Sequence, residues 1–284
     1  MAWLSFRLDN QVFCGWKDGE EVAILGVDPV ETWLIDEAGS REKAKTAPRI
    51  QLSDLNLMQP VPRPGKILAL ALNYHAHAAE TGREPPGVQK WFVKQATAAN
   101  GPYDAVELPA VSDDLDHEAE LVVVIGKYAK NLNEDQAMDC IAGVCVGCDY
   151  SVRDWQKASP TMIMGKGFDT HAPFGPWITP LGEIDDLDAL EVRCFVNDTL
   201  RQSGYVGDMV FSIREQISHL TKAFTLEPGD LIFTGTPAGV GVAADPPRFL
   251  KRGDRVRIEI DGLGYIEQEI HAGSSTAYLS TEPA

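Results

Sequence analysis

The segment DHEAELVVVIG, residues 116–126, carries two glutamates at the start of an apolar run. Alternate side chains of a β-strand point to the same face, so we expect Glu118 and Glu120 to project together. Two like charges in such positions repel each other, and a sheet gains no stability from holding them. A solvent-exposed strand face would tolerate the pair, and a hard divalent cation such as Mg²⁺ or Ca²⁺ would neutralise it. The segment therefore predicts either an exposed strand face or two ligands of a metal site.

A third acid downstream favours the metal site. The small apolar run GVCVGC predicts a buried strand that ends directly before Asp149, and polar residues typical of a helix follow it. An acid at a strand end is positioned to complete a site of three carboxylates. Arg153 and Gln156 follow on one face of the predicted helix, and we expect both to point to the same place.

Three further segments carry groups that suit chemistry on an organic acid. In MGKGFDTHAPFGPWITP, Lys166 lies between two glycines that allow close backbone approach. DLIFTGTPAGVG leads from a predicted strand into a glycine-rich loop, whose N–H groups and threonine hydroxyls, including that of Thr236, can bind an anion. LALALNYHAHAAE places His77 and Glu80 one helical turn apart, so the carboxylate can orient the imidazole as a general base.

Five of these segments resemble a known family in their order. NYHAHAAE, DHEAELVVVIG, DYSVRDWQ, GKGFDTHAPFGPW and TGTPAGVG are similar to motifs of the fumarylacetoacetate hydrolase family, and the resemblance covers about residues 60–272. It implies an α+β fold with a mixed β-roll or barrel-like sheet. It also implies a metal-dependent site for 2-oxo or 2,4-dioxo acids and, usually, a homodimer.

The resemblance assigns the metal ligands and the base. Glu118, Glu120 and Asp149 match the family's metal ligands, and Mg²⁺ is the expected ion, with Mn²⁺ or Ca²⁺ as alternatives. His77 and Glu80 match a base dyad on a mobile lid.

The resemblance also assigns groups that contact the substrate. Arg153 and Gln156 match substrate-binding groups, and Lys166 matches a catalytic group that contacts the substrate or its enolate. Thr236 matches a contact to the substrate carboxylate. One position departs from the pattern, because many relatives have proline where this chain has Gln95, in a loop that usually lines the pocket.

These groups together predict a metal-dependent hydrolase that cleaves a carbon–carbon bond in a 2,4-dioxo acid of the acylpyruvate type, which releases pyruvate and a second acid. One alternative is a 2-oxo acid decarboxylase or a tautomerase or isomerase that acts on an oxaloacetate-like or unsaturated 2-oxo dicarboxylate. Another is a catalytically silent carboxylate-binding protein. The pairing of His77 with Glu80 favours hydrolysis and counts against a silent protein.

Two other histidines lie near the motifs without an expected role in chemistry. His117 precedes Glu118 and, by strand alternation, points away from the carboxylates, which predicts a structural or surface role. The spacing of His75 from Glu80 does not place both on one helical face, so we expect it to be non-catalytic.

Composition limits the partners. The chain has 25 basic and 42 acidic residues and a net charge of −17, which argues against nucleic acid or an anionic membrane as a partner. An organic acid must therefore be attracted by a local cation. The chain lacks a run of about 18 apolar residues, so no membrane span is expected. MAWLSFRLDN does not have the pattern of a secretory signal.

The five cysteines form an odd set in apolar contexts, which is typical of reduced thiols and predicts a cytoplasmic protein. Cys145 and Cys148 have the Cys-x-x-Cys spacing of zinc and redox sites. No second pair with zinc spacing accompanies them, and both occur in an apolar strand pattern. We therefore expect buried core cysteines.

The pattern of the whole chain predicts two domains. Residues 1–60 read as a small β-rich domain with strands at WLSFRL, QVFCGW and EVAILGV, and PVPRPGK reads as a linker to a catalytic domain at 61–284. In the larger domain six segments predict strands: ILALAL, ELVVVIG, CIAGVCVGC, EVRCFVN, DLIFTG and RVRIEI. Helices are expected at NEDQAMDCIAG and SIREQISHLTKAF, and a hairpin at VNDTLRQ. Strands outnumber helices without regular alternation, which favours a mixed α+β fold.

Overall fold

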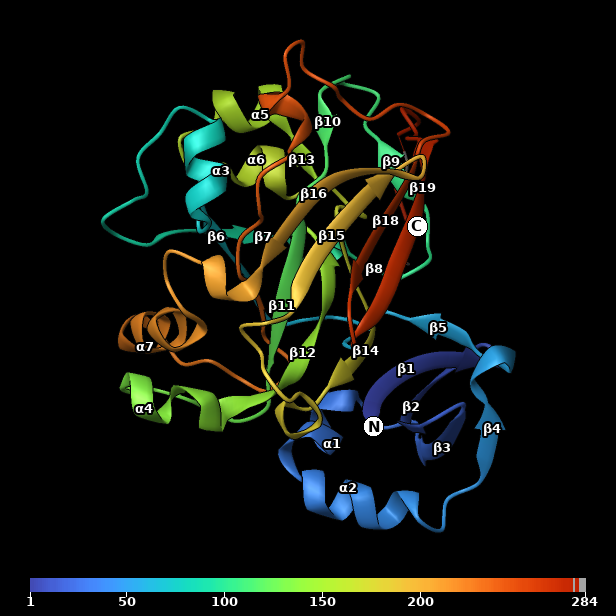
Figure 1. Ribbon diagram of the computed structural model, residues 1–284. Coiled ribbons are helices and arrows are strands. Elements are labelled where there is room, and N and C mark those ends of the chain that lie inside the picture. Colours follow the sequence, from blue (N-terminus) through green and yellow to red (C-terminus); the bar gives the residue numbers. More distant parts are fainter. Residues whose placement is uncertain (278, 281–284) are drawn as a thin grey trace.

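The main sheet of the computed structural model, which describes residues 1–277, 279 and 280, has twelve strands (Figure 1). Along the sheet the order is β4 (Arg49–Gln51), β3 (Glu21–Gly26), β2 (Gln11–Asp18), β1 (Ala2–Leu8), β14 (Ala172–Thr179), β12 (Ile141–Cys148), β11 (Ala119–Ile125), β17 (Leu231–Phe233), β6 (Ile67–Ala71) and β7 (Lys90–Lys94). Beside this path, β5 (Asn56–Met58) pairs with β1 and β8 (Ala99–Asn100) pairs with β14.

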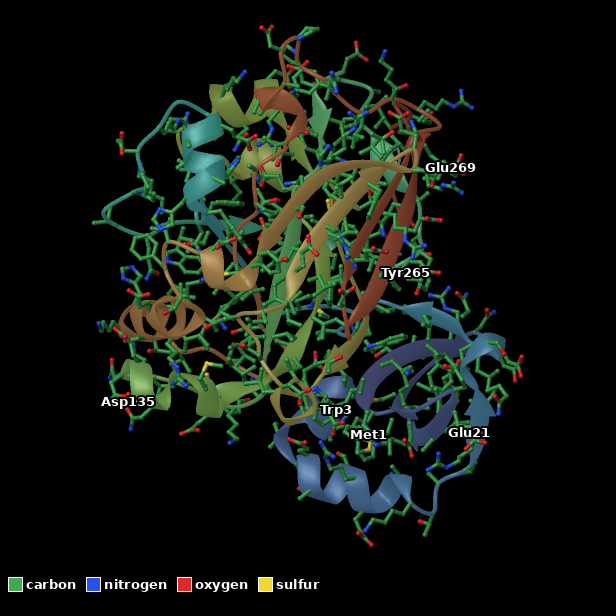
Figure 2. All side chains as sticks on the ribbon, in the orientation of Figure 1. Met1, Trp3, Glu21, Asp135, Tyr265 and Glu269 are labelled. Carbon is green, nitrogen blue, oxygen red and sulfur yellow. The ribbon has the colours of Figure 1, made fainter. Side chains whose placement is uncertain are left out.

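The N-terminal strands continue this sheet. Strand β1 pairs with β14 through Trp3 and Ile178, and Trp3 is fully buried where the N-terminal strands meet the rest of the chain (Figure 2). The strands predicted near the N-terminus are confirmed as β1, β2 and β3. Between β3 and β4 the chain forms α1 (Val30–Ile35) and α2 (Glu37–Ala44). The division into domains at 1–60 and 61–284 stays a prediction.

The central strands are buried on both faces. In β11 the side chains of Leu121 and Val123 belong to one hydrophobic cluster, whereas Val122 belongs to a second cluster on the other face. In β12, Cys148 lies in the first cluster and Cys145 in the second. The prediction of buried core cysteines is confirmed, because all five are buried and free, and the sheet separates this pair.

A second sheet packs against the first. It has five strands in the order β16 (Thr199–Tyr205), β15 (Glu191–Val196), β18 (Arg255–Ile260), β19 (Gly264–Ala272) and β9 (Val106–Leu108). Asn197 and Asp198 have φ angles of 48° and 63° and form the turn of the predicted hairpin between β15 and β16. A small sheet pairs β10 (Leu115–Asp116) with β13 (Ser151–Val152). The mixed α+β class is confirmed, and the described sheets stay open rather than closing into a barrel.

The two predicted helices begin where expected. Helix α7 (Ile213–Ala223) starts with a capping box between Ser212 and Glu215. Asn133 caps α4 (Glu134–Ala137), but this helix is shorter than predicted. A 3₁₀ turn follows at Met138–Cys140, and the chain enters β12 at Ile141. Pairing of the apolar residues with β11 outweighs their local helical pattern.

Three short helices gather at one end of β11 and β12 (Figure 1). They are α3 (His75–Glu80), α5 (Arg153–Ala158) and α6 (Ile163–Lys166). They carry residues of three of the five sequence motifs described above. None of the helices formed by the described residues is long and apolar enough to cross a membrane.

We predict that the chain forms a homodimer of about twice its 31.0 kDa mass. Strand β16 is at the edge of the second sheet, and its Leu200 and Tyr205 side chains are each 51% exposed. An open edge with exposed apolar side chains favours association, and a two-fold dimer is the commonest solution. Light scattering at micromolar concentration measures the mass directly. A monomer with full activity at that concentration would contradict the prediction.

Candidate active site

Three buried carboxylates meet at the end of β11 and β12. Glu118 directly precedes β11, Glu120 is its second residue, and Asp149 directly follows β12. The antiparallel pairing of the two strands brings these positions together, and the Asp149 N–H donates to the Glu118 carbonyl at 2.9 Å. One ligand atom from each carboxylate lies within 4.8 Å of the others. Among the described residues this is the only group of three or more His, Cys, Asp or Glu side chains that could hold a metal ion.

Two buried lysines and an arginine compensate most of this negative charge. The Lys166 ammonium donates to Glu118 at 2.7 Å and to Asp149 at 2.6 Å. The Lys94 ammonium donates to Asp149 and to the Tyr150 carbonyl. Lys94 had no predicted role, although its place directly before Gln95, in a segment that the family resemblance puts beside the pocket, was a sequence signal.

The two glutamates differ in their electrostatic surroundings. Burial opposes ionisation of Glu118, but the charges of Lys166 and Arg153 outweigh burial and hold the pKa of Glu118 below its usual value. Burial and repulsion from Asp149 and Glu118 raise the pKa of Glu120 well above its usual value. The charge of Lys166 offsets this rise only in part, and Glu120 forms no ion pair within the described part of the chain. Three converging carboxylates, one of them without an ion-pair partner among the described residues, suit a hard divalent cation.

The loop after β17 orients carboxylates of the protein itself. Its N–H groups donate to Glu120 from Gly235 at 2.7 Å and to Glu80 from Gly239 at 2.8 Å. The loop was predicted to bind an anion, and the anions that it binds in the structure are side-chain carboxylates of the protein itself. Gly235 and Gly239 have φ angles of 104° and 110°, which L-residues rarely adopt. A Cβ atom on Gly239 would lie 1.9 Å from the Arg201 carbonyl oxygen, so the loop needs glycine there.

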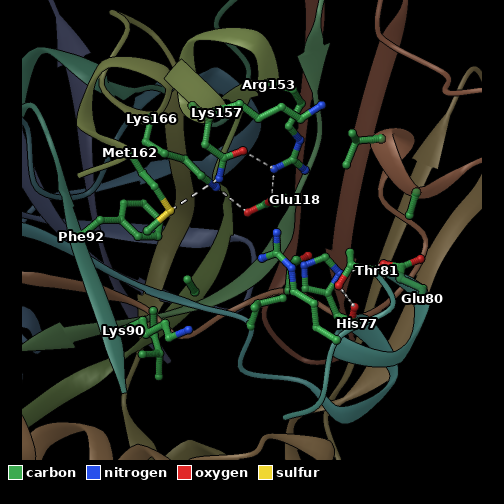
Figure 3. Close-up of a pocket in the computed structure, with 18 of the residues that line it drawn as sticks. His77, Glu80, Thr81, Lys90, Phe92, Glu118, Arg153, Lys157, Met162 and Lys166 are labelled. Carbon is green, nitrogen blue, oxygen red and sulfur yellow. Dashed lines mark hydrogen bonds and ion pairs between the residues drawn. The ribbon is translucent and has the colours of Figure 1, made fainter. Parts of the chain in front are cut away.

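The predicted pairing of His77 with Glu80 is present in the structure. The His77 Nδ1 atom lies 2.7 Å from the Glu80 carboxylate, and His77 faces the cavity that is also lined by Glu118 and Glu120 of the carboxylate cluster (Figure 3). With a proton on Nδ1 shared with Glu80, the Nε2 atom is free to accept a proton. His75 is exposed on the same helix and outside the cavity lining.

The start of α3 is held by Asn73, whose side chain donates to the Thr234 carbonyl at 2.7 Å.

A buried ion pair holds the arginine of the site. The Arg153 Nε atom donates to Asp116 at 2.9 Å, and its Nη1 atom lies 2.7 Å from Glu118. Asp116 also accepts from the N–H groups of Gly241 at 2.7 Å and Val242 at 2.9 Å. Sequence reasoning missed Asp116, although it shares strand alternation with Glu118. Asp116 therefore fixes Arg153 to the same loop that orients Glu120.

The remaining predicted substrate contacts lie in or beside the cavity. Gln156 accepts a hydrogen bond from Arg153 Nη1 at 3.0 Å and lines the cavity. The Thr236 hydroxyl donates to the Ala119 carbonyl at 2.8 Å and accepts from Gln202 at 2.7 Å, so protein groups occupy it. Its role as a substrate contact stays a prediction. His117 lies outside this cavity and bonds to Gln202 at 3.0 Å, which agrees with a structural role.

The cavity has a volume of about 590 Å³. Its lining includes Glu118, Lys166, Phe92 and Met162 (Figure 3). Glu120 also lines it. Gln95 is absent from the described lining; its side chain lies beside Gly167, where an added Cβ would be 3.1 Å from Cγ of Gln95.

The sequence motifs and this geometry agree with the outcome of comparison with known proteins. The family described as Fumarylacetoacetate (FAA) hydrolase C-terminal matches residues 66–271. The chain belongs to the fumarylacetoacetate hydrolase family. This confirms the resemblance inferred from the five motifs, and the match includes every residue placed in the cavity above.

Relatives within this family carry out different reactions. The chain is 42% identical over 220 residues to the mitochondrial oxaloacetate tautomerase of Xenopus laevis, which covers 77% of this chain and 69% of that protein. It is similar to maleylpyruvate hydrolase from Sphingobium sp. SYK-6, solved in complex with manganese(II) ion and pyruvate, with 32% identity, a TM-score of 0.82 and coverage of 96% and 100% of the two chains. A 5-carboxymethyl-2-hydroxymuconate delta-isomerase from Mycobacterium smegmatis gives 29% identity, a TM-score of 0.81 and the same coverage.

We predict that Asp116→Asn destabilises the protein by about 2 kcal/mol, because the buried Arg153 loses one of its two anionic partners and keeps only Glu118. Urea denaturation followed by circular dichroism measures this change. Asp113→Asn is a matched control, since Asp113 is an exposed acid three residues away. Equal stability of the two variants would show that Asp116 does not hold the arginine.

Proposed function

We propose that this chain is a divalent-metal-dependent hydrolase that cleaves the carbon–carbon bond between C3 and C4 of a 2,4-dioxo acid and releases pyruvate and a second acid. The observation that carries the proposal is the meeting of three buried carboxylates with the His77–Glu80 pair around one cavity. The maleylpyruvate hydrolase relative acts on a 2,4-dioxo acid and contains manganese(II) and pyruvate in its structure, which supports the proposal.

Glu118, Glu120 and Asp149 would hold the ion, and Mg²⁺ or Mn²⁺ fits their oxygen ligands. When bound there, the ion supplies a positive charge that polarises the 2-oxo carbonyl group and favours the enolate. Arg153 and Gln156 line the same cavity and can bind the 1-carboxylate, with Thr236 as a further contact.

Lys166 is suited to stabilise the enolate. A lysine ammonium has three N–H donors, and two of those of Lys166 are used by Glu118 and Asp149. Lys166 lines the cavity, so its third donor is available to the oxygen on which negative charge develops. Its two ion pairs keep the ammonium in place during the reaction.

His77 is suited to move the protons. Its Nε2 atom takes a proton from water while Glu80 stabilises the imidazolium that results. The hydroxide adds to the C4 carbonyl, the C3–C4 bond breaks, and its electron pair passes into the enolate of pyruvate. Return of the proton from His77 to C3 completes the products, so atoms and charges balance.

Tautomerisation of oxaloacetate is the second candidate, supported by the 42% identity to the Xenopus laevis tautomerase. The same residues serve it: His77 removes a proton from C3, Lys166 stabilises the enolate, and the proton returns to the oxygen or to C3. Decarboxylation would also pass its electron pair into the enolate, but it needs no base to take a proton from water. The three reactions share the enolate and differ in what happens before and after it forms.

The products separate these candidates. Purified protein with Mg²⁺ or Mn²⁺ is incubated with a panel of acylpyruvates and with oxaloacetate, and products are followed by mass. Pyruvate with a second acid supports hydrolysis, whereas faster keto–enol exchange of oxaloacetate without cleavage supports the tautomerase. Carbon dioxide release from oxaloacetate supports the decarboxylase. If no member of the panel is converted or bound in the presence of metal, the proposal is wrong.

We predict that Glu120→Gln lowers turnover by at least roughly 10²-fold, because the ion loses one carboxylate ligand and its positive charge is less completely neutralised by the protein. Initial rates at increasing Mg²⁺ concentration measure the loss and any partial rescue. Glu20→Gln, at an exposed position outside the cavity, is the control. Full activity of the unmodified protein after thorough chelation with EDTA would remove the metal from the mechanism.

We predict that His77→Ala lowers hydrolysis by roughly 10²-fold, as expected when a general base is lost. His75→Ala provides a matched control on the same helix, since His75 is exposed and does not line the cavity. Steady-state rates for hydrolysis and for oxaloacetate decarboxylation are compared, and decarboxylation should fall less because it needs no hydroxide. An equal fall in both reactions would mean that His77 binds the substrate rather than activating water.

A further inference from the structure

A second cavity lies beside the active-site cavity, on residues that the proposed reaction does not use. Its volume is about 370 Å³, which is within the range of sites for small organic ligands. Among the described residues it shares only Glu80 and Ala243 with the active-site cavity. The rest of its lining comes from the β15–β16 hairpin, the loop after β17, the segment before β18 and the residue His117.

His117 lines this second cavity with one ring nitrogen free. The side chain is only 3% exposed, and its Nδ1 atom lies 3.0 Å from Oε1 of Gln202. The same oxygen accepts from the Ala119 N–H at 3.0 Å, and the Gln202 amide nitrogen donates to the Pro237 carbonyl at 2.8 Å. Oxygen Oε1 is therefore the acceptor, and Nδ1 of His117 is the donor. The Nε2 atom has no hydrogen-bond partner among the described residues, so in the neutral imidazole it is a free acceptor.

A β-bulge brings Arg201 to the same cavity. Pairing of β16 with β15 joins Gln202 to Cys194 and Leu200 to Phe195, so Arg201 is the extra residue between them. A bulge interrupts the alternation of side chains along a strand and re-aims one of them. Arg201 lines the second cavity, whereas the neighbouring Gln202 is buried in the core.

The cations of this cavity are free to bind a ligand. They are Arg201 in the bulge and Arg248 in the segment before β18. Within the described part of the chain, neither guanidinium group forms an ion pair or donates a hydrogen bond. Each therefore keeps its full set of donors in a fork that matches a carboxylate.

The acids of this cavity are already occupied by protein groups. The two oxygens of Glu80 lie 2.7 Å from His77 Nδ1 and 2.8 Å from the Gly239 nitrogen. The two oxygens of Asp254 accept at 2.8 Å from a side-chain amide in the β15–β16 turn and at 2.7 Å from a backbone N–H. A ligand in the cavity therefore meets free guanidinium donors and one free imidazole acceptor.

These free groups define the chemistry of the ligand. Guanidinium donors pair with a carboxylate, and the free acceptor requires a donor such as a hydroxyl group. Apolar side chains also line the cavity and suit a short carbon chain; they include Leu200, Val240 and Phe249. Two acids and two guanidinium groups leave the charged lining neutral, so a monoanion fits it better than a dianion such as phosphate.

We infer that the second cavity is a binding site for a small hydroxycarboxylate. The carboxylate pairs with Arg201 and Arg248, and the hydroxyl donates to Nε2 of His117. The ligand contacts the loop at Gly239 and Gly241, whose N–H groups donate to carboxylates of the active site, without entering the active-site cavity. The inference does not depend on which reaction the active site performs.

Binding of matched acids to the full chain tests the inference. The probes are ω-hydroxy acids of three to six carbons and the unsubstituted acids of the same lengths, so each pair differs by one terminal hydroxyl. The series varies the distance between the two polar ends. Isothermal titration in the presence of Mg²⁺ gives dissociation constants without requiring turnover. We expect at least one hydroxy acid to bind about fivefold more tightly than its unsubstituted partner, as one hydrogen bond provides, and more tightly than inorganic phosphate.

Variants assign the binding to residues. His117→Asn keeps an N–H donor near the position of Nδ1 and removes Nε2, so it should abolish the preference for the hydroxyl while both acids still bind. Arg201→Met should weaken both acids about fivefold and keep the preference. Lys157→Met is the matched control, because it removes a cation from the active-site cavity alone and should change neither affinity. Thermal melts followed by circular dichroism check that each variant is folded.

Each unfavourable outcome overturns a defined part of the inference. Equal binding within every pair by the unmodified protein overturns the hydroxycarboxylate site. A preference that persists in His117→Asn overturns the assignment to His117. Binding that is lost in Lys157→Met and kept in Arg201→Met would place the ligand in the active-site cavity, and these two variants decide the location even if His117→Asn does not fold. Tighter binding of inorganic phosphate than of any hydroxy acid overturns the ligand class.

Discussion

The hydrogen bonds donated by the loop after β17 are the interaction on which the site depends. Buried carboxylates are stable only when donors or cations satisfy them. Here one loop donates from Gly235 to Glu120, from Gly239 to Glu80, and from Gly241 to Asp116. The three acids belong to the cluster of three carboxylates, to the His77–Glu80 pair and to the ion pair that holds Arg153. A shift of the loop would therefore disturb all three groups of the candidate site at the same time.

The chemistry of the site follows from how its charges are divided. The inner carboxylates are balanced by buried cations, except at Glu120, which has no ion-pair partner among the described residues. In the proposed function a divalent ion would complete the neutralisation there, so that a strongly acidic protein could bind an organic acid. The same groups would stabilise an enolate however it forms, and relatives in this family include hydrolases, an isomerase and a tautomerase. We propose that the reaction depends on whether water reaches the C4 carbonyl beside His77.

The sequence predicted those parts of the site whose residues have local signals. Glu118 and Glu120 share strand alternation, Asp149 follows a recognisable strand, and His77 and Glu80 are one helical turn apart. Lys94 and Asp116 were not found, because their partners Asp149 and Arg153 are distant in the chain and meet them only through sheet pairing. The anion-binding capacity of the glycine loop was recognised, but its anions proved to be carboxylates of the same chain. Likewise α4 ended early because strand pairing at Ile141, a tertiary interaction, competes with the local helix pattern.

Strand β7 presents Lys90, Phe92 and Lys94 on one face, and this has a consequence for how the cavity can change in evolution. Lys90 and Phe92 line the cavity, and Lys94 binds Asp149 in the carboxylate cluster. A side chain of this strand can therefore be repositioned along the cavity wall only in steps of about 7 Å, the repeat of a pleated strand. Exchanging the residues at positions 90 and 92 would bring the lysine ammonium one such step closer to the carboxylate cluster. Changes made on a strand are thus stepwise, and finer adjustment has to come from the helices and loops opposite.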